Sequence, residues 1–221
     1  MTHNQSSFIM VVKRECPTCL LVVAVVKQLL QAGKQIEIYC QDDESFHEEV
    51  KPIHHDMNLE QSFRYDIEYV PTLIRKENDD ETGRVFGWNR EEWERLTGIE
   101  PLGEGLPESQ PGCGSKSVEP GVMEQLQARF GAVPIASRKV EVSPWDDPVE
   151  LAYTRGWTDG LPIVPPTDDR ILRMLGGTER QPDEVVGIMP PNMQECTIEK
   201  IAINAVMAGA KPEYMRVILA V

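Results

Sequence analysis

The sequence predicts an α/β fold over residues 1–98, followed by a linker at 99–121 and a small α+β module at 122–221. Three observations support this division. An apolar strand leads through a pair of cysteines into an apolar helix, and an alternating strand, QIEIYC, follows that helix. The segment 99–121 is rich in Gly, Pro, Ser and Glu, as linkers are. We therefore predict the order β-α-β-α-β-β-α before the linker.

The first strand and helix enclose the motif Cys16-Pro17-Thr18-Cys19. If Cys16 stands just before the first helical turn, its sulfur faces unpaired backbone N–H groups and the positive end of the helix dipole, which favour the thiolate. Cys19 lies one turn further along, where it can attack a mixed disulfide formed at Cys16. Pro17 suits a first turn because its φ is already helical. We therefore predict that Cys16 is the nucleophile and that Cys19 resolves the mixed disulfide.

The remaining elements of the first region follow in order. Residues 41–56 are polar and acidic, and we expect a loop with a short helical piece. Helical spacing of Leu59, Phe63 and Ile67 predicts a helix. A strand from residue 69, a turn, a second strand and a helix capped by Asn89 and Gly98 complete the region.

The C-x-x-C motif at a helix start, the later Val70-Pro71-Thr72 at the head of a strand, the hairpin and the closing helix together resemble the thioredoxin superfamily. The resemblance covers about residues 8–98 and implies a three-layer fold. In that family the matching proline is cis and lies against the dithiol, and the residue before it offers backbone hydrogen bonds to the bound polypeptide. The resemblance thus implies that Val70, Pro71 and Thr72 hold the substrate.

The chain departs from thioredoxins at several positions. Glu15 replaces the Trp before the first cysteine, and Pro-Thr between the cysteines is closer to glutaredoxins. Met10 stands where the family has a buried acid, so proton transfer at Cys19 has no evident mediator. The hairpin lacks the Gly-Gly of the glutathione site in glutaredoxins, which speaks against glutathione as the partner.

Composition restricts the classes of partner. The 221 residues carry a formal net charge of -14, which argues against nucleic acid or an anionic membrane. The N-terminus has no basic region and no cleavage site of a signal peptide, so we expect a cytoplasmic protein. Five cysteines are an odd number, which favours reduced thiols with one redox-active pair. The sequence has no phosphate-binding glycine loop, and we expect no cofactor.

A metal site is the alternative interpretation of Cys16 and Cys19. Further ligands would have to come from Cys40, His47, His54 or His55, which show no second ligand motif. We therefore predict no metal, a buried Cys40, and a solvated His54-His55-Asp56.

Cys113 lies within the predicted linker, in Pro111-Gly112-Cys113-Gly114-Ser115. Two interpretations stay open. Cys113 is either a third thiol that relays oxidation to the Cys16/Cys19 pair, or an incidental cysteine in a turn.

The module at 122–221 contains helical patterns, strand patterns at 136–142 and 185–191, and a helix capped by Thr197. Residues 145–221 resemble an uncharacterised bacterial domain associated with a Cys- or selenocysteine-Gly-Ser-Cys motif, which implies no established reaction. Asp159 is either a ligand or acid or a turn former, and Cys196 is either a reactive thiol or a half-buried residue. The chain stops inside an apolar run, so we expect a truncated module or one covered by another subunit or another copy.

These patterns predict a thiol-disulfide oxidoreductase that is targeted by its C-terminal module and in which Cys16 attacks a protein disulfide or a small oxidised sulfur species. The physiological direction of electron flow stays open. Two alternatives stay open. One is a non-catalytic docking or redox-regulatory subunit of a larger complex, and the other is a metal carrier that uses Cys16 and Cys19.

Overall fold

The computed structural model describes residues 6–43, 46–47 and 49–220. Expectations that fall on the remaining residues lie outside this description, including those for the extreme N-terminus, part of the loop at 41–56 and the last residue. The chain divides into two compact units, Met1–Leu126 and Gln127–Val221, and each is described by itself.

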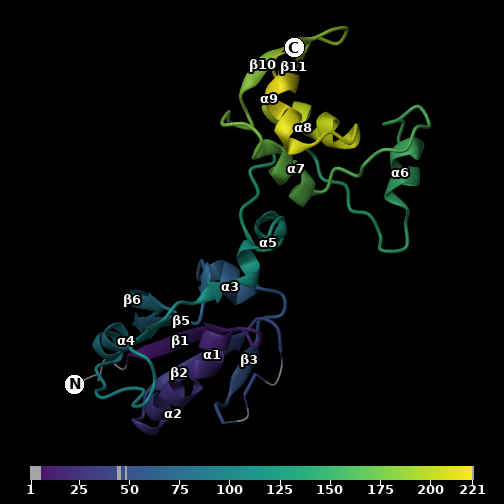
Figure 1. Ribbon diagram of the computed structural model, residues 1–221. Coiled ribbons are helices and arrows are strands. Elements are labelled where there is room, and N and C mark those ends of the chain that lie inside the picture. The colour runs from purple at the N-terminus through teal and green to yellow at the C-terminus, as the bar shows by residue number, and fades with distance from the viewer. Residues whose placement is uncertain (1–5, 44–45, 48, 221) are drawn as a thin grey trace. The chain divides into compact units, whose positions relative to one another are not determined.

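A five-stranded mixed sheet forms the centre of the first unit, in the order β3-β2-β1-β5-β6 (Figure 1). The central strand β1 (Ser7–Val12) pairs in parallel with β2 (Gln35–Cys40), which pairs in parallel with β3 (Ile53–His55). On its other side β1 pairs antiparallel with β5 (Thr72–Glu77), which forms a hairpin with β6 (Asp80–Phe86). All residues of β1 from Phe8 to Val12 are buried, because the strand is central and covered.

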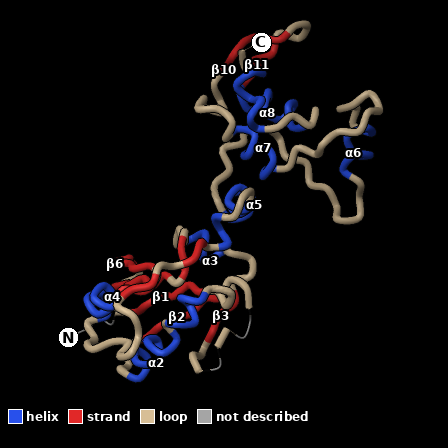
Figure 2. Tube along the Cα trace, in the orientation of Figure 1, coloured by secondary structure: helices blue, strands red, loops and turns tan. Residues whose placement is uncertain are grey.

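The helices of this unit complete a thioredoxin-like fold (Figure 2). They are α1 (Pro17–Leu21), α2 (Val23–Gln31), α3 (Glu60–Arg64) and α4 (Arg90–Thr97). The predicted fold class is therefore confirmed. Asn89 caps α4 by accepting a hydrogen bond from the N–H of Glu92, and Gly98 ends α4 in the left-handed conformation, as predicted.

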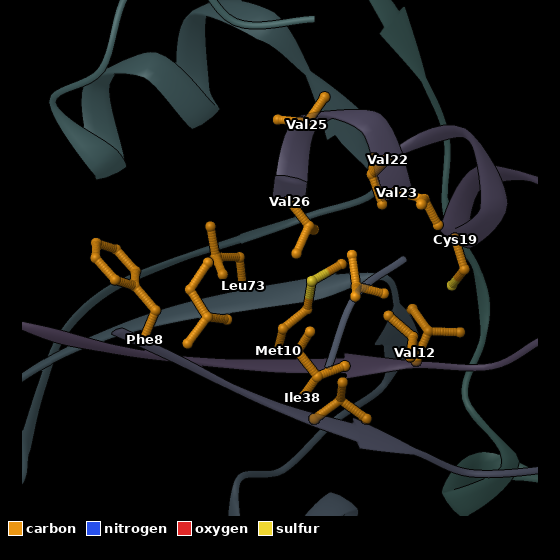
Figure 3. Close-up of a cluster of buried hydrophobic side chains, with 14 of the residues drawn as sticks. Phe8, Met10, Val12, Cys19, Val22, Val23, Val25, Val26, Ile38 and Leu73 are labelled. Atoms are coloured by element: carbon orange, nitrogen blue, oxygen red, sulfur yellow. The ribbon is translucent and has the colours of Figure 1, made fainter. Parts of the chain in front are cut away.

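The helix after the cysteines is buried on one face only. Figure 3 shows Val22 and Val26 directed toward Met10 and Ile38 of the sheet. Leu20 of α1 is 46% exposed, although the run from Leu20 to Val26 is apolar without interruption. A surface helix needs only one apolar stripe, so the continuous apolar run overstated its burial.

Residues 41–56 also differ from the expected loop. They contain β3, and Asp56 is buried although we expected it to be solvated. The Asp56 carboxylate accepts hydrogen bonds from the backbone N–H groups of Gln61 and Ser62 at the start of α3. His54 and His55 are exposed, as expected.

The segment at 99–121 packs against the first unit, in contrast to the linker that its composition predicted. Two short strand pairs hold it: β7 (Trp88–Asn89) with β8 (Ser109–Gln110), and β4 (Tyr69–Val70) with β9 (Cys113–Gly114). Leu102 is fully buried in the core. The 3-10 helix η1 (Lys116–Val118) and helix α5 (Val122–Phe130) follow, and α5 includes the boundary between the units.

The second unit is built from short elements around a small core. The core contains Ile171, Met174, Ile198, Ala202 and Met215, among others. The elements are α6 (Pro148–Thr154), α7 (Asp168–Leu175), β10 (Val185–Met189), β11 (Gln194–Thr197), α8 (Ile198–Met207), η2 (Pro212–Tyr214) and α9 (Met215–Ile218).

Two expectations for the second unit have clear outcomes. Thr197 caps α8 through its side chain, as predicted. The strand predicted at 136–142 is wrong, because Ala136 and Ser137 donate their N–H groups to the Glu199 carboxylate instead of a neighbouring strand. Among the described helices of both units, none combines the length and apolar character that crossing a membrane requires.

Candidate active site

Cys16 and Cys19 lie where β1 passes into α1. Cys16 is the residue immediately before the helix, with extended backbone angles (φ -93°, ψ 116°), and Pro17 opens the first turn. Cys19 lies within that turn. Both cysteines have 0% of their surface exposed, so solvent does not reach either sulfur directly.

Hydrogen bonds stabilise the thiolate of Cys16. The Cys19 thiol makes the largest contribution, the Cys113 thiol adds to it, and the backbone N–H groups of Cys19 and Thr18 contribute further. Burial acts in the opposite direction, because it disfavours a charge. The hydrogen bonds prevail and lower the pKa of Cys16 to about 5. Cys16 therefore carries a thiolate at neutral pH.

Burial raises the pKa of Cys19 far above its usual range, and the hydrogen bond to Cys16 raises it further. The N–H of Lys13, at 3.4 Å from the Cys19 sulfur, acts in the opposite direction. The two cysteines of the motif thus separate into a thiolate and a protonated thiol that donates to it. In this arrangement the Cys16 thiolate can attack a disulfide, while the Cys19 thiol keeps its proton until the mixed disulfide has formed.

The loop that carries Val70, Pro71 and Thr72 lies beside the cysteines. The Val70–Pro71 peptide bond is cis, and the carbonyl oxygen of Val70 lies 3.5 Å from the Cys16 sulfur. Thr72 is buried and donates its hydroxyl to the carbonyl of Tyr69 at 2.7 Å. Its side chain therefore stabilises the loop.

A segment of the same chain occupies the backbone edge beside Pro71. In the β4–β9 pair, Cys113 lies opposite Val70 and Gly114 lies opposite Tyr69. The N–H of Ser115 donates to the carbonyl of Glu68 at 2.8 Å and extends the pairing. This edge is where the thioredoxin resemblance implied a bound polypeptide.

Cys113 belongs to the same cluster of thiols. Its sulfur is hydrogen-bonded to that of Cys16, and the side chain is partly exposed. Burial raises the pKa of Cys113, and the neighbouring Cys16 thiolate raises it further. The structure thus brings Cys16, Cys19 and Cys113 together, and of these three thiols only Cys113 reaches the surface.

Sequence reasoning missed the residues that hold this segment. The Thr18 hydroxyl donates to the carbonyl of Pro111 at 2.7 Å and accepts from the Gln110 side chain at 3.0 Å. Gly112 lies so close to Val70 that an added Cβ would stand 2.7 Å from the Val70 carbonyl oxygen. The glycines on both sides of Cys113 were the available signal, since glycine permits close backbone approach.

The other candidate residues lie elsewhere. Cys40 is buried at the end of β2, as expected, and burial raises its pKa. Cys196 belongs to the second unit, where it lines a pocket of about 680 Å³. Asp159 is exposed and accepts a hydrogen bond from the N–H of Leu161 within a turn. Across the described part of the chain, no group of three or more His, Cys, Asp or Glu side chains is arranged to hold a metal ion.

Comparisons with known proteins identify similar structures but no family. No family model and no curated protein matches the sequence. A reduced thioredoxin pre-protein from Schistosoma mansoni is 18% identical, with a TM-score of 0.33, over 44% of this chain and 80% of its own. StoA from Bacillus subtilis is 14% identical, with a TM-score of 0.34, over 42% of this chain and 83% of its own.

Proposed function

We propose that the protein is a thiol-disulfide oxidoreductase whose reacting atoms are the sulfurs of Cys16 and Cys19. The observation that carries the proposal is the split between these two thiols, one stabilised as a thiolate and the other held protonated beside it. A purely structural pair of cysteines in a core has no need of this arrangement, because burial alone favours two neutral thiols.

In the proposed reaction, the Cys16 thiolate attacks one sulfur of a partner disulfide and releases the other sulfur as a thiolate. The mixed disulfide at Cys16 is then attacked by Cys19, which gives its proton to the second departing thiolate. The products are a Cys16–Cys19 disulfide and a reduced partner, so two electrons pass from protein to partner. The Val70 backbone lies beside Cys16 and is paired with Cys113 of the same chain, so it aligns a partner chain only when that pairing opens.

The hydrogen bonds that stabilise the Cys16 thiolate act only in the reduced protein, and oxidation to the disulfide removes this stabilisation. The reduced protein is therefore favoured over the oxidised one. A thiolate stabilised well below its usual pKa is a good leaving group, which makes the disulfide easier to reduce. We therefore expect a reduction potential nearer to about -120 mV than to about -270 mV, so that the reduced pair passes electrons only to disulfides that are themselves easily reduced.

The test is the reduction potential of the purified chain. Thiols are trapped across a series of glutathione redox buffers in Cys113→Ser and in the same variant with Cys19→Ser added, so that Cys113 cannot replace Cys19 as the second thiol. A two-electron transition in Cys113→Ser that disappears when Cys19→Ser is added supports the proposal. The absence of a transition, or thiols that stay protected until a chelator is added, would reject it and favour a metal carrier.

A docking role for the second unit is a separate candidate. Val185, Ile188 and Met189 of β10 are exposed, although they are large and apolar. Exposed apolar surface of this kind is typical of contact with another protein. If this role is correct, Ile188→Glu will abolish a complex of the full chain with its physiological partner and leave the reduction potential unchanged. An unchanged complex would reject the docking role.

A further inference from the structure

The segment at 109–115 pairs with strands β4 and β7 of the first unit in the way that a bound peptide pairs with the edge of a sheet. The register of the β4–β9 pair sets Cys113 opposite Val70, and the Val70 carbonyl lies 3.5 Å from the Cys16 sulfur. Pairing of an extended strand with an exposed edge is a general mode of peptide recognition. The chain therefore supplies its own occupant for the edge that a partner polypeptide would use.

Contacts on both sides of Cys113 define its position. The Pro111 carbonyl accepts from the Thr18 hydroxyl at 2.7 Å, and the Gly114 carbonyl accepts from the Lys13 ammonium at 2.9 Å. Ser115 is buried and accepts from the Gln41 side chain. These contacts fix the backbone before and after Cys113, so its sulfur is held at Cys16 rather than carried by a free loop.

Accessibility assigns an order to the three thiols. Cys16 and Cys19 are fully buried, whereas Cys113 is partly exposed. A disulfide arriving from solvent meets Cys113 first. We infer that Cys113 is a third redox thiol, through which electrons pass from the Cys16/Cys19 pair to external disulfides by way of a Cys16–Cys113 disulfide. The inference rests on the proposed function of that pair.

The proposed sequence of exchanges balances. Cys113 attacks an external disulfide, forms a mixed disulfide with one half and releases the other half together with the Cys113 proton, as a thiol. The Cys16 thiolate attacks the Cys113 sulfur and releases the second half as a thiolate. Cys19 then attacks the Cys16 sulfur, closes the Cys16–Cys19 disulfide and passes its proton to Cys113. Cys113 ends as it began, and two electrons have reached the external disulfide.

The hydrogen bond between Cys113 and Cys16 supports the first exchange. It places one proton between the two sulfurs, with the thiolate on Cys16 at rest. Cys16 takes that proton as the Cys113 sulfur attacks and passes it to the departing half, which leaves as a thiol and restores the Cys16 thiolate. After the first exchange, the Cys16 thiolate lies next to the sulfur that it must attack.

The test follows disulfides in the full chain after reaction with a bis-nitrobenzoate disulfide, whose released halves are coloured. Samples are quenched in acid, alkylated and mapped by mass spectrometry. In Cys19→Ser, which cannot complete the last exchange, we expect a Cys16–Cys113 disulfide and release of both halves of the reagent. Adding Cys113→Ser to this variant must leave one half attached to Cys16.

The rate of Cys16–Cys19 disulfide formation gives the second readout. We expect Cys113→Ser to slow it about tenfold or more at sub-millimolar reagent, because an internal thiol acts at a higher effective concentration. Cys196→Ser, which removes the partly exposed thiol of the second unit, is the matched control and leaves the rate unchanged. A rate in Cys113→Ser equal to or above that of the wild type would overturn the inference. It would identify the segment at 109–115 as a cover, which only shields Cys16 and Cys19 from external disulfides.

Gly112→Val separates the two interpretations without removing a thiol. Its side chain collides with the Val70 carbonyl and weakens the β4–β9 pair. A relay predicts less Cys16–Cys113 disulfide in the Cys19→Ser background and slower oxidation, whereas a cover predicts faster oxidation. If the wild type forms no Cys16–Cys19 disulfide at all, the proposed function fails together with the relay. If Cys113→Ser forms the Cys16–Cys19 disulfide at the wild-type rate, only the relay through Cys113 is rejected and the proposed function stands.

Discussion

Strand β1 of the first unit and strand β10 of the second have similar apolar sequences but opposite environments. Every residue of β1 after Ser7 is buried, whereas every residue of β10 is exposed. The central strand has neighbours on both edges and helices against the sheet, whereas β10 belongs to a two-stranded hairpin. Apolar composition therefore did not determine burial, and the number of neighbouring elements did.

The same contrast applies to the cysteines. Three thiols of the first unit meet at the end of a buried strand, where their hydrogen bonds separate their pKa values. Cys196 lies in the hairpin of the second unit, next to α8. We thus expect the redox chemistry in the first unit, where the three thiols meet, and the following experiments test that contrast.

The largest expected effect is on turnover. Cys16→Ser removes the attacking sulfur and should reduce the rate of disulfide reduction by about 10³-fold or more. Cys196→Ser should leave the rate unchanged. Both are measured as dithiothreitol-driven reduction of a disulfide substrate. Comparable losses in the two variants would contradict the assignment of chemistry to the first unit.

The next effect is on stability. Trp93 is fully buried, packs edge to face on Trp88 and donates its indole N–H to the Gly87 carbonyl at 3.0 Å. We expect Trp93→Ala to cost about 3–5 kcal/mol of the free energy of unfolding of the first unit, measured by hydrogen exchange of β1 amides. Trp145 of the second unit is 94% exposed. Trp145→Ala should change stability by less than about 0.5 kcal/mol.

A smaller effect is expected within the second unit. The buried Glu199 carboxylate accepts hydrogen bonds from the N–H groups of Ala136 and Ser137, at 3.0 and 2.8 Å. Burial opposes its charge, but these hydrogen bonds prevail and lower its pKa. We expect Glu199→Ala to cost about 1–3 kcal/mol, seen as faster hydrogen exchange in α8. Unchanged exchange in β1 is the control, and faster exchange there would show that the units do not unfold separately.

The smallest expected effect is the change in the free energy of unfolding for each unit of pH. The pKa of Cys16 is lowered to about 5 in the folded protein, so its thiolate stabilises the fold above its ordinary pKa, near 9. That stability is lost as the pH falls toward 5. The free-energy difference between reduced wild type and Cys16→Ser, measured by hydrogen exchange of β1, should shrink by about 1.4 kcal/mol per pH unit in this window. A constant difference would show that Cys16 is an ordinary thiol.

Much of the first unit was predictable because its signals are local. An apolar strand, a C-x-x-C motif at a helix start and a Val-Pro-Thr loop each have meaning within a few residues. The lowered pKa of Cys16 had the expected direction, but its largest cause is the Cys19 thiol. The sequence interpretation considered only the unpaired N–H groups and the dipole at the helix start.

The segment at 99–121 was not predictable in the same way. Its composition is that of a linker, yet its backbone groups find partners in β4, β7 and the side chain of Gln41. Such pairing depends on a strand edge contributed by residues far away in the sequence. Local composition does not report the presence of that edge, so the position of Cys113 became visible only in the structure.

The side chain of Gln41 makes the two ends of the segment unequal. Its amide nitrogen donates to the hydroxyls of Ser62 and Ser115, and its oxygen accepts from the N–H of Lys116. These contacts are buried around Ser115, whereas the Pro111 end is held by the Thr18 hydroxyl and, just before it, by the β7–β8 pair. Any opening of the segment should therefore be a local separation of residues 111–114 that starts at Pro111 while Ser115 stays in place. An incoming polypeptide would enter from the Thr18 side, and the Ser115 amide would keep its protection from exchange while the Cys113 amide loses it.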